Sequence, residues 1–172
     1  MSEKMLSALL LLAVAASPLL VQASVQTPTL TSCSSSEKVV LSDVTIQNAQ
    51  IGQKMTANFS LTINEPLKSK PKLQVTLTKQ DGRKVNCISH MGSCKYDLCR
   101  KDNIVEETLS KSWGNTCPVP ATTLQETVDV VLPTMLKFII GNPPTTLTVK
   151  LEVTNDEKTV GCQSFKFHIA AA

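Results

Sequence analysis

Six cysteines and two histidines are the side chains in this sequence that could do the most chemistry. A zinc site is not expected, because no C-x2-C pair occurs and His90 and His168 lie far apart in the chain. Residues 1–23 have the pattern of a secretory leader, and an even number of cysteines after such a leader is typical of disulfides. Six cysteines can pair in many ways, and the spacing alone does not choose among them. The cysteines are Cys33, Cys87, Cys94, Cys99, Cys117 and Cys162.

Groups that could form a catalytic site are sparse. No serine lies in a G-x-S-x-G elbow, and there is no H-E-x-x-H sequence, paired-carboxylate motif or phosphate-binding glycine loop. His168 falls on the polar face of an expected strand and His90 in a small cysteine-bounded loop, so both are interpreted as exposed histidines. We therefore expect a binding protein with no cofactor. A hydrolase that uses one of these histidines as its base is the alternative.

The most apolar segment of the expected mature chain is 130–141, VVLPTMLKFIIG, which does not alternate cleanly. One interpretation is a buried edge strand. The other is an apolar rim that admits an acyl chain. Trp113, the only tryptophan, follows a polar stretch and belongs either at a lipid or membrane interface or inside the fold. The candidate lipid-contacting residues are Trp113, Leu132, Met135, Leu136, Phe138, Ile139 and Ile140.

Residues 1–23 have the pattern of a signal peptide. Lys4 precedes an apolar run over 6–21, and Val21–Ala23 fits the small-x-small cleavage pattern. The run is short for a transmembrane helix, so a membrane anchor is the weaker interpretation. We expect cleavage after Ala23 to leave 24–172 as a single secreted domain.

The charge of the chain gives little support for a nucleic-acid partner. Its formal net charge is +3, and no cluster of lysine and arginine accompanies an aromatic ladder. A small basic excess of this kind is ordinary for a protein surface, although it favours transient contact with an anionic membrane.

Alternation of apolar and polar residues predicts the elements. Residues 55–63 alternate without error, which is typical of a half-buried strand. Asp81-Gly82 is a hairpin signal, and Val85 begins the expected return. Short strands separated by turn signals predict an all-β, immunoglobulin-like sandwich of two sheets. Further strands are expected at 72–78, 147–153 and 164–169, weaker ones at 38–47 and 124–132, and a strand or short helix at 104–112.

Asn58-Phe59-Ser60 is an N-glycosylation sequon. Asn58 falls on the polar face of the strand expected at 55–63, where a glycan would point into water. A sequon can also occur by chance, but the secretory leader favours its use. We predict that Asn58 carries a glycan.

The order of the cysteines and their neighbours resembles a known family. Gly92-Ser93-Cys94 closes a short loop, Cys117-Pro118 follows, and Gly161-Cys162 lies in the final strand. In this order and spacing the chain is similar to the ML-domain lipid-recognition family, and within it to the branch of GM2-activator-like proteins. The similarity covers residues 33–169, and the sequon at Asn58 also matches that branch.

The resemblance implies a sandwich opened into a cup that holds a lipid. It implies the disulfides Cys33–Cys162, Cys87–Cys94 and Cys99–Cys117, and an extracellular or lysosomal location. Activators of this branch present a glycosphingolipid to a hydrolase without being enzymes, and relatives carry sterols, phospholipids or lipid A, some of them as partners of immune receptors.

The stretch 100–116 departs from the activator branch. It is shorter and lacks the additional cysteine pair found there. Lipid binding is expected to survive this difference, whereas activation of a hydrolase does not follow from it. Alternation shows which face of each strand is inside, but it leaves open whether the interior is filled by side chains or by a ligand.

Overall fold

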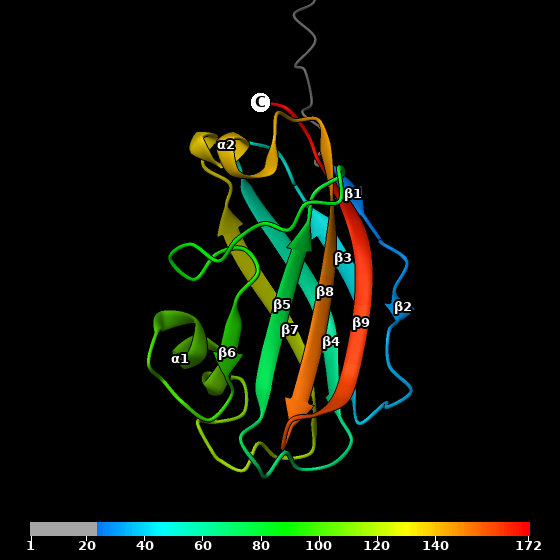
Figure 1. Cartoon of the computed structure of the whole chain (residues 1–172), viewed down its shortest axis with the longest axis vertical. Coiled ribbons are helices and arrows are strands. Elements are labelled where there is room, and N and C mark those ends of the chain that lie inside the picture. The colour runs from blue at the N-terminus through cyan, green and yellow to red at the C-terminus, as the bar shows by residue number, and fades with distance from the viewer. Residues whose placement is uncertain (1–23) are drawn as a thin grey trace, which may run out of the picture.

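Two antiparallel β-sheets lie face to face in a computed structural model, which describes residues 24–172 (Figure 1). This architecture confirms the predicted two-sheet sandwich, while the predicted signal peptide lies outside the described residues. The four-stranded sheet has the order β1-β3-β4-β7, and the five-stranded sheet has the order β2-β9-β8-β5-β6. The strands are β1 (Val25–Gln26), β2 (Thr31–Ser32), β3 (Val39–Gln47), β4 (Lys54–Ile63), β5 (Lys72–Thr78), β6 (Lys95–Asp97), β7 (Thr122–Val131), β8 (Thr145–Asn155) and β9 (Lys158–Ile169).

The alternating segments of the sequence form the long strands, as predicted. β5 has the predicted bounds, and β8 and β9 extend beyond theirs. After the turn at Asp81-Gly82, the Val85 amide donates to the Leu77 carbonyl at 2.8 Å. The return stays a short bridge rather than a strand, and the chain continues through a loop to β6.

Two segments that lacked a clear strand pattern are helical. The ambiguous segment 104–112 forms α1 (Ile104–Lys111), whose N-cap Asn103 accepts hydrogen bonds from the amides of Val105 and Glu106. Beyond Val131, the edge-strand interpretation of the apolar segment is wrong. Pro133 follows the end of β7, and the chain then turns through the 3-10 helix η1 (Thr134–Leu136) into α2 (Lys137–Ile140). Figure 1 shows α2 at one end of the sandwich, above β7.

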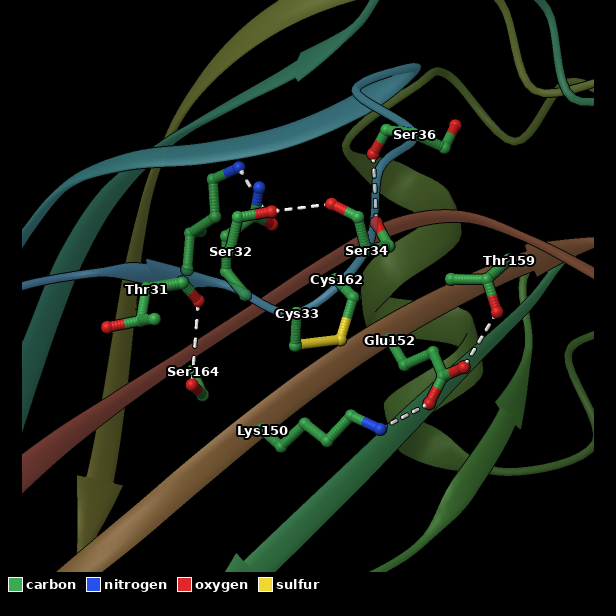
Figure 2. Close-up of a disulfide and its surroundings, with 12 residues drawn as sticks. Thr31, Ser32, Cys33, Ser34, Ser36, Lys150, Glu152, Thr159, Cys162 and Ser164 are labelled. Atoms are coloured by element: carbon green, nitrogen blue, oxygen red, sulfur yellow. Dashed lines mark hydrogen bonds and ion pairs between the residues drawn. A yellow bond between two sulfur atoms is a disulfide. The ribbon is translucent and has the colours of Figure 1, made fainter.

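The sandwich is closed along one edge only. The two sheets approach most closely where β3 faces β9. A Cβ atom built on Gly161 of β9 would lie only 2.9 Å from the carbonyl carbon and Cβ of Val39, and closer still to its carbonyl oxygen. The disulfide Cys33–Cys162 lies beside this contact (Figure 2). At the opposite edge β7 and β6 end their sheets without pairing to each other.

Three disulfides bind the chain, and they are the pairs that the resemblance implies. Cys33–Cys162 spans 129 residues and ties the start of the domain to its last strand. Cys87–Cys94 joins cysteines 7 positions apart, and Cys99–Cys117 joins cysteines 18 positions apart on either side of α1. Every cysteine between residues 24 and 172 is bonded, so none can serve as a zinc ligand.

Asn58 lies on the outer face of β4, as the alternation predicted. It faces Thr127 of β7 in the register, and the Thr127 hydroxyl donates to the Asn58 side-chain oxygen at 2.7 Å. The Asn58 amide nitrogen donates to the Thr45 hydroxyl at a long 3.4 Å. Glycosylation of this residue remains a prediction.

Candidate functional site

The interior of the sandwich is not filled by side chains. Many aliphatic and aromatic residues that face inward are only partly buried, including Leu61, Leu73 and Leu77. Inward-facing residues at the closed edge, such as Val39 and Ile46, are fully buried. This difference follows from the splayed geometry, because the sheets separate away from β3 and β9. Two apolar cavities lie between them.

The larger space, named here the outer cavity, has a volume of about 260 Å³ and lies at the α2 end of the sandwich. Asn86 is the only polar side chain in its lining. Of the residues predicted to contact lipid, Leu132, Leu136, Ile139 and Ile140 contribute to its wall. The other lining residues are Met55, Val75, Leu77, Val85, Ile88, Met91, Gly92, Val130, Val131, Pro133, Leu147, Phe167 and Ile169.

The mouth of the outer cavity is rimmed by apolar side chains that reach into solvent. Ile88 and Met91 line the cavity and are 51% and 53% exposed, in the loop closed by Cys87–Cys94. Met135 and Phe138 line neither cavity, but they adjoin the lining residues Leu136 and Ile139 in η1 and α2 and are 64% and 82% exposed. We name Ile88, Met91, Val131, Met135 and Phe138 the apolar collar.

Ile88 and Met91 were missed by the sequence analysis. The available signal was the presence of two large apolar residues in an otherwise polar eight-residue loop. The loop is held by Tyr96 of β6, whose hydroxyl donates to the His90 carbonyl at 2.7 Å. Burial, with a smaller contribution from Glu106, raises the pKa of Tyr96, so its hydroxyl stays protonated as a donor.

The second space, named here the inner cavity, has a volume of about 110 Å³ and lies further along the strands. Trp113 contributes to its wall and is 7% exposed, so this residue packs inside the sandwich and not at a membrane interface. Gln163 of β9 is the only lining residue with an amide side chain, and no charged residue is present. The remaining lining residues are Val39, Leu41, Phe59, Leu61, Ile63, Leu67, Leu73, Leu98, Leu109, Leu151 and Val153.

Helix α1 positions Trp113, and a buried carboxylate fixes the helix. The two oxygens of Glu106 accept hydrogen bonds from the amides of Asp97 at 2.8 Å and Asp102 at 3.0 Å. These bonds satisfy the charge of a side chain that is 6% exposed. The segment 100–116, where this chain differs from the activator branch, thus contains a compact helix that packs against the inner cavity.

The two histidines take no part in either cavity. His90 and His168 are exposed, and neither contributes to a cavity wall. The His168 ring nitrogen Nδ1 lies 3.3 Å from the Thr146 hydroxyl on the outer face of the five-stranded sheet. Within residues 24–172, no helix is long and apolar enough to span a bilayer, and no cluster of three or more potential metal-ligating side chains occurs.

A two-sheet sandwich splayed around apolar cavities is the architecture of a domain that holds an apolar ligand. The family model for the ML domain matches residues 28–169, and the chain belongs to this family. Members of the family are lipid-binding proteins and not enzymes, so the chain is a lipid-binding domain.

Several solved structures are similar to the chain at low sequence identity. A Niemann-Pick type C2 protein from Japanese carpenter ant is 14% identical, with 82% of this chain and 98% of that chain covered and a TM-score of 0.48. A putative β-galactosidase from Bacteroides fragilis is 15% identical over 84% of this chain and 16% of that chain, with a TM-score of 0.31. A β-glucuronidase from Bacteroides uniformis is 9% identical over 84% and 13%, with a TM-score of 0.33. No curated protein matches the chain.

Proposed function

We propose that the chain is a secreted lipid carrier of the GM2-activator-like type, which holds an acyl chain in the outer cavity. The observation that carries this proposal is the enclosed apolar space of about 260 Å³ with a solvent-exposed apolar mouth. The candidate lipid-contacting residues of the wall are Leu132, Leu136, Ile139 and Ile140. Met135 and Phe138 would contact the ligand or a membrane at the mouth.

Burial of an acyl chain in such a cavity is sufficient for useful affinity. Apolar burial contributes about 25 cal/mol per Å², so covering about 300 Å² of a hydrocarbon chain supplies about 8 kcal/mol. That free energy corresponds to a dissociation constant in the micromolar range. A carrier needs reversible binding of this order, because it must also release the lipid.

The collar supports transient contact with a membrane during loading. Phe138 and Met135 present large apolar side chains to solvent, and Lys137 lies between them with its Nζ 5.4 Å from the Phe138 ring centroid. Apolar side chains beside a lysine suit insertion at an anionic lipid surface. The three disulfides support an extracellular or lysosomal destination, where such bonds persist.

Presentation of a glycosphingolipid to a partner hydrolase is the finer part of the proposal. It is supported by the cysteine order and the sequon shared with the activator branch. The short helical segment at 100–116 is where this chain differs from that branch, so a phospholipid or sterol remains a competing ligand.

A second candidate is an innate-immune or signalling interaction domain that binds a protein partner. One observation favours it. An open cleft of about 650 Å³ is lined by Lys68, Lys70, Lys72 and Arg100, with Asp97 among them. A partner that still binds this cleft after the lipid has been removed would favour this function.

The test uses native mass spectrometry of the secreted protein after exposure to gangliosides, phospholipids and sterols. Leu136→Asp places a charge in the cavity wall, and Thr134→Asp places the same charge on an exposed position of the same 3-10 helix that lies outside the collar. We expect Leu136→Asp to abolish lipid loading and Thr134→Asp to retain it. A wild-type protein that stays empty with all three lipid classes contradicts the proposal, as does equal loading of the two variants.

A further inference from the structure

Gln163 is a polar side chain at an inward position of the sandwich. Residues Gly161, Gln163 and Phe165 share the inner face of β9, and the register places Gln163 opposite Leu151. Every other residue in the wall of the inner cavity, apart from the indole of Trp113, has a purely apolar side chain. A half-buried amide at this position requires hydrogen-bond partners, because an unpaired polar group in an apolar site destabilises the fold.

One end of the Gln163 amide is used by the protein. Its oxygen Oε1 accepts a hydrogen bond from the Leu41 amide of β3 at 3.4 Å, which is long for this type of bond. Because Leu41 is a donor, the oxygen must face it, and this fixes the orientation of the amide. The amide nitrogen then points away from Leu41 and donates to no residue between 24 and 172.

Trp113 lines the same cavity but supplies no second donor to it. Its indole Nε1 has no hydrogen-bond partner among the described residues, yet it is closed off by protein atoms and does not open into the cavity. The Gln163 amide nitrogen is therefore the donor that the wall offers to a ligand. A hydrogen bond to such a group contributes about 0.5–1.5 kcal/mol.

We propose that the inner cavity is a polar subsite that takes an uncharged oxygen, a hydroxyl or a carbonyl, carried by the buried part of the lipid. This inference rests on the proposed lipid-binding function. An uncharged oxygen fits because the donor is neutral and no lysine, arginine or histidine lines the cavity. A carboxylate placed there would lose its hydration without gaining a cation.

The subsite lies further along the strands than the outer cavity. Val149 and Phe165 are paired in β8 and β9, face inward between the two cavities and line neither. A ligand that enters at the collar would reach Gln163 only if the partly buried Phe165 side chain turned aside.

The test compares two ligands of matched size, decan-1-ol and 1-chlorodecane, which differ in hydrogen-bonding capacity at one end. Their dissociation constants are measured by displacement of the uncharged fluorophore N-phenyl-1-naphthylamine. Gln163→Leu removes the donor, and Gln125→Leu is the matched control on the outer face of β7, where Gln125 donates to Ser60. The ratio of the two constants is the readout, so a general loss of affinity does not affect it.

We expect Gln163→Leu to shift the ratio about five- to tenfold against decan-1-ol, which is the value of one hydrogen bond. Gln125→Leu leaves it unchanged. A ratio that is the same in the wild type and Gln163→Leu, with both ligands bound, overturns the polar subsite while leaving lipid binding intact. Failure of the wild type to bind the fluorophore and both ligands overturns the proposed function and the subsite together.

Discussion

Substitution of Gly161 by alanine tests the closed edge of the sandwich. The backbone of Gly161 is not in the left-handed region, so alanine introduces no backbone strain and acts only through its added methyl group. That methyl would lie 2.9 Å from the Val39 carbonyl carbon and Cβ, and closer to the carbonyl oxygen. Backbone atoms cannot rotate away, so β9 and β3 must separate. Such overpacking costs about 1–3 kcal/mol.

The assay is thermal unfolding of the disulfide-intact protein. A loss of about 1–3 kcal/mol lowers the Tm of a domain of this size by about 3–10 °C. Because Gly161 lines neither cavity, the lipid load measured by native mass spectrometry should stay that of the wild type.

Gly82→Asn is the control for this substitution. Gly82 has open space around it, and asparagine tolerates its φ of +82° better than other residues do. We expect the Tm of this variant to change little. A Gly161→Ala protein whose Tm equals that of the wild type would refute the close approach of the two sheets.

Three further predictions concern the disulfides, one carboxylate and the sequon. Replacing both cysteines of Cys33–Cys162 by alanine should lower the free energy of unfolding by about 5 kcal/mol, because the long loop strongly restrains the unfolded chain. The same replacement at Cys87–Cys94 should cost only about 2 kcal/mol. Denaturant titration of the two variants measures both losses, and a larger loss for Cys87–Cys94 contradicts the prediction. Hydrogen bonds from Lys150 and Thr159 lower the pKa of Glu152 in the folded protein. Ionised Glu152 therefore adds to the free energy of unfolding at a pH above the pKa that it has in the unfolded chain, and this contribution is lost as the pH falls through its lower pKa in the folded protein. Thr159→Val should raise that pKa in an NMR titration. Asn58→Gln should remove the mass that a glycosidase releases from protein secreted by eukaryotic cells, and an unchanged mass in the wild type contradicts use of the sequon.

The strands could be predicted because each has one face in water and one inside. This condition produces the alternation at 55–63 and 72–78 and the strand bounds that follow from it. The helix α1 could not be assigned, since eight residues with a weak apolar face give too short a pattern. The 130–140 segment was recognised as unusual from its composition, but only the structure shows that Pro133 redirects it across the end of the sandwich.

The walls of the cavities were harder to predict than the strands that carry them. Alternation assigns Leu73 and Leu77 to the inside whether the space opposite them is empty or filled. The sequence pattern of a cavity wall is therefore the same as that of a filled core. Gln163 lies two residues before Phe165, and extending the alternation by one step would have placed it inward. A polar residue at an inward position was an available sign that the interior is more than an apolar core.

The separation between the closed edge and the cavities explains how a sandwich can keep a hollow interior without losing its fold. Gly161 and Cys33–Cys162 hold β3 and β9 together at one edge, where Val39 and Ile46 are fully buried. These contacts hold the two sheets together, so the inner faces of β4 and β5 need not pack on each other. Substitution of a closed-edge residue that lines neither cavity, such as Gly161, should therefore lower stability and spare ligand binding. In a sandwich whose interior is filled by side chains, this separation of stability from ligand binding would not exist, because every inward residue would pack against the opposite sheet.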